Sequence, residues 1–135
     1  MKTLTSVQRV IAATIIGLSA TAASVAAAEP GALDGKKFEG VFIQRGKTSG
    51  DADTVVFQGG RFRSQACDRY GYSDAAYSTT TQGDYVTFEA ETESTKYGRL
   101  LWKGVIHVDQ FTATATMMRQ GKPPVENWVV AAAKR

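Results

Sequence analysis

The chain has 135 residues, with 16 Lys and Arg side chains against 13 Asp and Glu. The first 28 residues hold two of the basic side chains, Lys2 and Arg9, and no acidic one, so the remainder carries 14 basic and 13 acidic side chains. This nearly neutral remainder has no basic run, which excludes the charge pattern typical of nucleic-acid-binding proteins.

The N-terminal segment has the pattern of a secretory signal peptide. Its two basic residues flank the start of an apolar run from Val10 to about Ala26, and Ala26-Ala27-Ala28 supplies the small residues of a cleavage position. The run is diluted by Ser and Thr, whereas a membrane-spanning helix needs about 20 apolar residues. We therefore expect residues 1–28 to be cleaved and the protein to be periplasmic or secreted. An uncleaved N-terminal anchor is the alternative.

Residues 29–135 are expected to form a single domain. Their number, 107, suffices for one hydrophobic core. Cys67 is the only cysteine, so an internal disulfide cannot form and stability has to come from the core itself.

From Asp34 onward, short alternating segments are separated by turn signals about every 8–12 residues, which is typical of sandwiches and barrels. The first such segment, about 36–45, places Phe38, Gly40 and Phe42 on its inner face. The pair Gly59-Gly60 predicts a tight hairpin. Its opposed pairs are Phe57 with Phe62 and Val55 with Ser64.

The segment from Val86 to Val108 predicts the most strongly patterned hairpin. A loop over 94–98 sets Glu93 opposite Arg99 and Glu89 opposite Lys103. On the other face Ala90 then meets Trp102, and Val86 meets Ile106. Opposite charges on one face and apolar groups on the other are what a half-buried sheet requires.

Three further features complete the predicted meander. Turns at Gln82-Gly83 and Asp109-Gln110 predict pairs of Thr79 with Val86, Tyr77 with Phe88, Ile106 with Ala113 and Trp102 with Met117. Pro123-Pro124 belongs in a loop because proline cannot donate a ladder hydrogen bond. The last strand, about 126–132, is expected to point Trp128 and Val130 inward.

About eight short strands, each joined to its sequence neighbour, predict an all-β fold: a single antiparallel up-and-down barrel, which hides both sheet edges. This layout resembles a lipocalin-like, or more broadly calycin-like, small exported barrel. The resemblance lies in layout, since Gly35-Lys36-Lys37-Phe38 lacks the tryptophan of the lipocalin Gly-x-Trp motif. It implies a barrel that binds a small ligand in its interior or at its mouth.

Cys67 is the first candidate site residue. If Phe62 points inward, strand parity over 61–67 directs Cys67 outward, or to the point where the strand breaks into a loop. The thiol is then either packed under that loop or accessible, able to pair with another chain or to ligate a metal or haem iron. Arg63 and Arg69 are close enough in sequence to lower the pKa of an accessible thiol.

The segment from Cys67 to Tyr77 is rich in aromatic residues. Tyr70, Tyr72 and Tyr77 surround Gly71 at what should be one mouth of the barrel. Tyrosine suits ligand pockets and protein interfaces alike, because it joins a flat apolar face to a polar tip. Together with Cys67 and Trp102 these tyrosines are the candidate ligand-binding residues, although the same cluster could instead pin the loop shut. We expect a largely filled interior with a shallow pocket near this loop.

The sequence does not predict an enzyme, a cofactor or a metal site. His107 is the only histidine and is expected to face outward near Tyr85. It has no second histidine or cysteine partner for a common zinc ligand set, and the chain contains no G-x-S-x-G or CxxCH motif. The row Glu89, Glu91 and Glu93 is interpreted as a solvated charge ladder.

Three functions remain as expectations. The first is a non-enzymatic binding module for a small apolar or aromatic ligand at the barrel mouth. The second is a protein-interaction module, such as an inhibitor of a secreted enzyme. The third is a thiol- or haem-linked accessory protein that uses Cys67.

Overall fold

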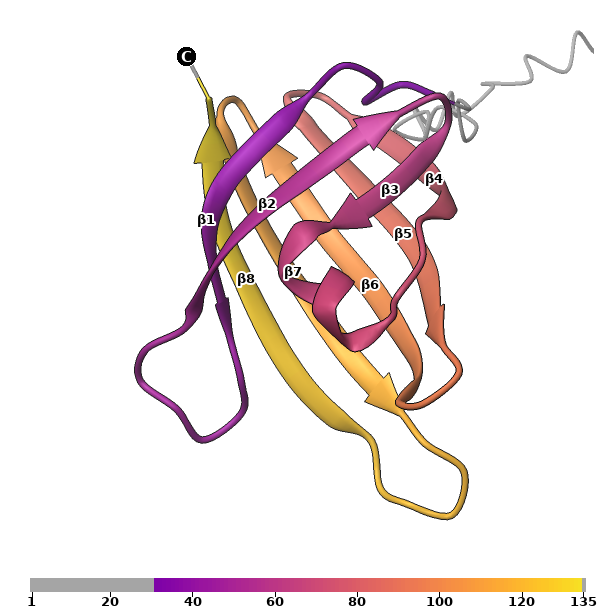
Figure 1. Cartoon of the computed structure of the whole chain (residues 1–135). Coiled ribbons are helices and arrows are strands. Elements are labelled where there is room, and N and C mark those ends of the chain that lie inside the picture. Colours follow the sequence, from indigo (N-terminus) through magenta and orange to yellow (C-terminus); the bar gives the residue numbers. More distant parts are fainter. Residues whose placement is uncertain (1–30, 135) are drawn as a thin grey trace, which may run out of the picture.

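The computed structural model describes residues 31–134, so the expected signal peptide lies outside the described residues. Within this range the strands follow one another around a single closed antiparallel barrel, and the last strand pairs with the first (Figure 1). The predicted up-and-down barrel is therefore confirmed. The elements are β1 (Lys37–Ile43), β2 (Asp51–Gln58), β3 (Arg61–Ser64), the 3-10 helix η1 (Gln65–Tyr70), β4 (Ala75–Gln82), β5 (Tyr85–Ser94), β6 (Gly98–His107), β7 (Gln110–Met118) and β8 (Val125–Ala133).

The register of two hairpins is as predicted. Phe57 lies opposite Phe62 across the Gly59-Gly60 turn. The β5–β6 pair has Glu93 opposite Arg99 and Ala90 opposite Trp102, together with the other two predicted pairs. The charged rows face outward, with a salt bridge of 2.9 Å from Arg99 to Glu91, one step along the row from Glu93.

Two other hairpins were predicted two residues out of register. Tyr77 pairs with Ala90 rather than Phe88, and Trp102 pairs with Ala115 rather than Met117. A shift of two residues keeps every side chain on its predicted face, because side chains alternate with a period of two. The inner and outer faces were therefore correct while the partners were wrong.

The prediction for β8 was wrong in its face. Trp128 and Val130 are 40% and 46% exposed, whereas Asn127, Val129 and Ala131 are buried. The cause lies at the seam with β1, where Gly40 is paired with Ala131. A Cβ built on Gly40 would stand 1.9 Å from the carbonyl oxygen of Val130, so the two strands approach too closely for a bulky inward side chain there.

Aromatic rings fill most of the barrel interior. Phe57 contacts four other phenylalanines and Tyr77 with ring centroids 4.9–6.3 Å apart. The rings of this cluster are Phe38, Phe57, Phe62, Phe88, Trp102 and Phe111, all at most 1% exposed. These rings explain why a chain without a disulfide can hold a barrel of this size.

The upper end of the barrel in Figure 1, called the closed end below, is plugged by the segment that precedes β1. Leu33 is buried, and its backbone N–H donates to the Tyr77 hydroxyl over 3.0 Å. That hydroxyl donates to Asp34 Oδ1 over 2.7 Å, and Asp34 accepts from the N–H of Gly60 in the β2–β3 turn. These hydrogen bonds connect Leu33, Asp34, Gly60 and Tyr77, a group called the latch below, and they close this end of the barrel.

The opposite end, called the open end, carries the longer connections. It is formed by the β1–β2, β5–β6 and β7–β8 loops, with η1 lying between them (Figure 1). No helix in residues 31–134 has the length and apolar character needed to cross a membrane.

Candidate functional site

A cavity of about 290 Å³ opens between η1 and the loops of the open end. Its volume lies near the lower limit for small-molecule sites. Its walls are largely apolar and aromatic. The lining residues are Phe42, Gln44, Arg45, Asp51, Ala66, Cys67, Tyr70, Tyr72, Tyr97, Leu100, Met117, Arg119, Val125 and Asn127.

The helix η1 forms one wall of the cavity and is fixed at both ends. It ends at Gly71, which adopts a left-handed φ of 79° that favours glycine. The hydroxyl of Ser94, in β5, donates to the carbonyl of Tyr70 over 2.7 Å and accepts from the N–H of Tyr97 over 3.2 Å. One serine therefore joins the aromatic wall from η1 to the β5–β6 loop, where the rings of Tyr70 and Tyr97 meet edge to face.

Cys67 lies in this wall and is only 5% exposed. Strand β3 ends at Ser64, so the parity that would direct Cys67 outward does not extend to it. Its sulfur lies 3.3 Å from Ser64 Oγ, which itself donates to the buried Asp53 carboxylate over 2.7 Å. The single hydrogen of the Ser64 hydroxyl is therefore shared between Asp53 Oδ2 and Cys67 Sγ as alternative acceptors.

The expected lowering of the Cys67 pKa is wrong. Burial raises the pKa of the thiol to about 11, the hydrogen bond with Ser64 offsets part of this rise, and the nearby Asp53 and Asp68 carboxylates add to it. Arg69 opposes this only weakly, as the last of the contributions. Arg63 is engaged elsewhere, since its guanidinium binds Asp68 through two nitrogens.

Tyr72 stands out because its hydroxyl is buried and has no hydrogen-bond partner within residues 31–134. The side chain is 7% exposed and lines the cavity next to Cys67. Desolvation raises the pKa of this phenol, with a smaller opposing effect from Arg119. A buried hydroxyl without a partner costs roughly 1–3 kcal/mol, a cost that a ligand acceptor would remove.

Two arginines stand at the rim of the cavity. The backbone N–H of Arg45 donates to Oδ1 of the buried Asn127, whose Nδ2 donates to the Ala115 carbonyl. Arg119 Nε donates to the Tyr97 carbonyl over 3.4 Å, and its guanidinium lies 5.4 Å from the Tyr97 ring centroid. Neither arginine forms a salt bridge within the described part of the chain.

The structure brings together three of the five predicted site residues. Cys67, Tyr70 and Tyr72 line the cavity. Tyr77 does not, because residues 71–74 carry the chain away from the open end and Tyr77 joins the latch at the closed end. Trp102 does not line it either: its ring is 1% exposed, its Nε1 donates to Thr92 Oγ1, and it packs against Phe42 beneath the cavity.

The sequence analysis missed Arg45, Tyr97, Arg119 and Asn127. A usable signal was present, because in an up-and-down barrel every second connection falls at the same end. The loops over 44–50, 95–97 and 119–124 therefore had to meet the connection that holds Cys67.

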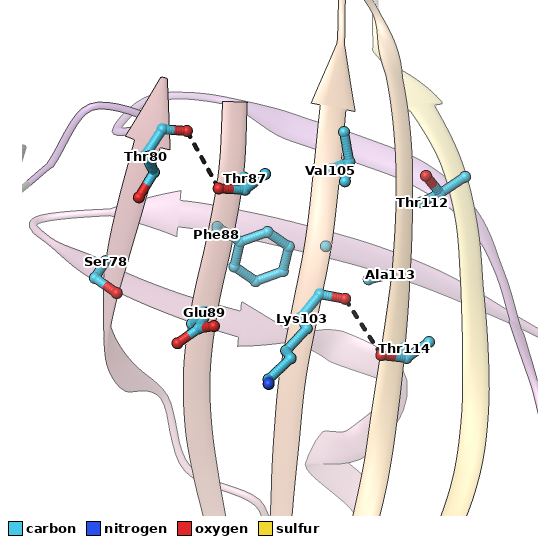
Figure 2. A pocket seen from close by; sticks show the side chains of 11 residues that line it. Ser78, Thr80, Thr87, Phe88, Glu89, Lys103, Val105, Thr112, Ala113 and Thr114 are labelled. Carbon is cyan, nitrogen blue, oxygen red and sulfur yellow. Dashed lines mark hydrogen bonds between the residues drawn. The ribbon is translucent and has the colours of Figure 1, made fainter. Parts of the chain in front are cut away.

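A wider depression of about 620 Å³ crosses the outer face of β4 to β7 (Figure 2). It is a trough on the exposed sheet surface, lined by hydroxyls and by Glu89 and Lys103. Thr87 Oγ1 donates to the Thr80 carbonyl and Thr114 Oγ1 to the Lys103 carbonyl, so two of the hydroxyls drawn there already have partners (Figure 2). The more enclosed apolar cavity at the open end is the better candidate site.

His107 faces outward as predicted and stacks on Tyr85, with ring centroids 4.2 Å apart. Among residues 31–134 no group of three or more His, Cys, Asp or Glu side chains is close enough to hold a metal ion. The chemistry available at the cavity is that of apolar contact, hydroxyl hydrogen bonding and guanidinium charge.

Comparison with known proteins supplies no relative: no family model, no curated protein and no solved structure matches the chain significantly.

Proposed function

We propose that this protein is an exported, non-enzymatic binding module that holds a small apolar or aromatic ligand in the cavity at the open end of the barrel. The observation that carries the proposal is the division of the interior. Packed rings fill the closed end and the middle, while the open end keeps a cavity of about 290 Å³ with aromatic walls. A ligand with one or two rings would bury its apolar surface against these walls, and this burial favours binding.

A protein-interaction role is the second candidate, and one observation favours it. Trp128, Val130 and Val41 are exposed on neighbouring positions of β8 and β1. Exposed tryptophan is enriched at protein interfaces. The third candidate, chemistry at Cys67, draws no support from a thiol that is buried and has a pKa near 11.

The test uses a neutral probe, 2-naphthalenemethanol, with binding followed by equilibrium dialysis. We expect saturable binding at one site per chain. Met117→Trp should abolish it by filling the cavity that Met117 lines. The adjacent Met118→Trp is the matched control, because Met118 lies opposite Arg99 on the outer face of the sheet.

Thermal unfolding of both variants establishes that each remains folded. Equal binding by the two variants would contradict the proposal, as would no binding to the parent protein. Native mass spectrometry of protein purified from the exported fraction adds a second measurement. It should show a chain that begins at Glu29 and a retained small molecule.

A further inference from the structure

We propose that the ligand is an amphipathic organic anion: a monocarboxylate whose body of one or two rings enters the cavity while its carboxylate stays at the rim. This inference rests on the proposed binding function and specifies the ligand class for the same cavity. Three observations support it: the basic loops of the open end, two guanidinium groups at the cavity that form no salt bridge within residues 31–134, and one buried hydroxyl without a partner there.

The loops and turns at the two barrel ends differ in the sign of their charge. The connection that holds η1, over 65–74, is not included in this comparison and has two acidic residues and one basic residue. Lys36, Lys37 and Lys134 lie near the closed end but outside its turns. The three loops of the open end, over 44–50, 95–97 and 119–124, contain five basic residues and no acidic one. The three turns of the closed end, over 59–60, 83–84 and 108–109, contain two acidic residues and no basic one. A cleft framed by one sign of charge concentrates ligands of the other sign.

The two cations at the cavity itself are available to a ligand. Arg45 and Arg119 line the cavity and form no salt bridge within residues 31–134. The one carboxylate in the lining, Asp51, is instead bound by Arg69 at 3.3 Å. The guanidinium groups at the rim are therefore not neutralised by the one acid in the cavity lining, and guanidinium pairs with carboxylate through two parallel hydrogen bonds.

The buried hydroxyl of Tyr72 gives a second, independent pointer to a polar ligand group. It has no partner within the described residues and lies close enough to Arg119 for the two to interact electrostatically. The hydroxyl is covered, so a ligand oxygen reaches it only if a neighbouring side chain moves, and the proposal assigns this movement to Arg119. Arg119 is suited to such a movement, because one long hydrogen bond of 3.4 Å and a ring contact hold it. A carboxylate between Arg119 and Tyr72 would satisfy both.

The apolar walls exclude a small inorganic anion as the best occupant. Phe42, Leu100 and Met117 offer it neither charge nor donors. The ligand must therefore join an apolar body to a single anionic group.

The experiment compares 2-naphthoate with 2-naphthalenemethanol, which has the same rings and no charge, on the parent protein and on single variants. We expect 2-naphthoate to bind at least about tenfold more tightly at low ionic strength, and added salt to weaken naphthoate binding alone. Arg119→Gln and Arg45→Gln should each remove most of this preference, measured as the ratio of the two affinities in the same variant.

Two controls separate contact from net charge and from folding. Lys122→Gln removes the same charge from the same loop as Arg119, and its side chain does not line the cavity, so we expect a small change. Tyr72→Phe should weaken naphthoate binding about tenfold, as expected for a lost hydrogen bond to a charged group.

The outcomes distinguish the two proposals. Equal affinity for the two probes, or a preference that survives both arginine substitutions, overturns the anionic ligand and leaves the binding module standing. Failure of both probes to bind overturns the binding module as well. Unchanged naphthoate affinity in Tyr72→Phe overturns the role of the hydroxyl.

Discussion

At the scale of single residues, a lone thiol in a protein that we propose to be exported needs a reason to stay reduced. Cys67 has one in its surroundings: it is packed in the wall formed by η1, within 3.3 Å of Ser64 Oγ and near two carboxylates. Both burial and negative charge disfavour the thiolate, which is the reactive form. The position of Cys67 protects it without a second cysteine.

We therefore expect the folded protein to react slowly with a disulfide reagent at pH 8. A thiol of pKa about 11 carries roughly a hundredfold less thiolate there than an unfolded cysteine. Burial slows the reaction further. The measurement is the rate of labelling by 5,5′-dithiobis(2-nitrobenzoate) in buffer and in guanidinium chloride. Rapid, stoichiometric labelling of folded protein would contradict the sheltered thiol.

Asp53, beneath η1, gives a prediction about pH. Desolvation raises its pKa, although its carboxylate accepts from Ser64 Oγ and from the Ala66 N–H. Because the folded state binds this proton more tightly than the unfolded state, Asp53 makes the free energy of unfolding fall as the pH rises from about 4 through the folded pKa.

Asp53→Asn should remove that fall while keeping both contacts, because the amide can accept from Ala66 and donate to Ser64. The difference in unfolding free energy between the variant and the parent should therefore shift in favour of the variant from pH 4 to pH 7. Urea denaturation at several pH values measures it. A difference independent of pH would show that the carboxylate does not titrate abnormally.

At the scale of elements, the barrel closes where glycine lets two strands approach. Gly40 in β1 faces β8, and an added Cβ would lie 1.9 Å from the Val130 carbonyl oxygen and 2.5 Å from Ala131 Cα. Both are backbone atoms, so no side chain can move aside to make room.

Gly40→Ala should lower the free energy of unfolding by about 2 kcal/mol or more, as expected for overpacking that displaces backbone. The comparison is Gly83→Ala in the β4–β5 turn, where nothing lies within 4 Å and φ is 57°. That change should cost about 1 kcal/mol through its left-handed backbone alone. Urea denaturation of both variants gives the difference. Equal losses would mean that closure of β1 on β8 tolerates a side chain.

The register of a hairpin was predictable where charges distinguished one alignment from the next. Between β5 and β6, Glu89 and Glu93 face Lys103 and Arg99. A slip of one residue would mix the charged and apolar faces, and a slip of two would leave one opposite-charge pair instead of two. Between β6 and β7 the outer partners are threonines, so an alignment two residues away looks equally good in sequence. Both slipped hairpins kept the correct faces.

The face of β8 could not be predicted from alternation, because both of its faces are apolar. Trp128 and Val130 are as hydrophobic as Val129 and Ala131. Two features decide which face of β8 points inward. One is the close approach of β8 to β1, and the other is the pair of hydrogen bonds that satisfies the buried side chain of Asn127.

The candidate site was predictable in its location and not in its composition. The tyrosine-rich connection does form one wall of the cavity, as the sequence suggested. The residues give no clear signal for the 3-10 turn that buries Cys67. They also give none for the return of the chain, which takes Tyr77 to the closed end. Tyr97 and Arg119 join the cavity from separate loops, so they required the topology.

At the scale of the whole molecule, the barrel has almost no net charge, but the loops at one end are basic and the turns at the other end are acidic. Five basic residues frame the open end, and the turns of the closed end carry Asp84 and Asp109. Three of those five, Lys47, Lys96 and Lys122, do not line the cavity. On the proposed anionic ligand they would act through their electric field rather than through contact, and this field extends about 10 Å at 0.1 M salt.

A variant in which Lys47, Lys96 and Lys122 are all replaced by Gln should therefore slow the association of 2-naphthoate several-fold at low ionic strength and leave its dissociation rate nearly unchanged. Long-range charge steers the encounter, whereas contacts at Arg45 and Arg119 set the residence time. Stopped-flow fluorescence at two salt concentrations separates the two rates. The matched control replaces Lys36, Lys37 and Lys134, near the closed end, and should change neither. If the first variant instead speeds dissociation, these lysines contact the ligand directly, and the field of the open end is not what guides it in.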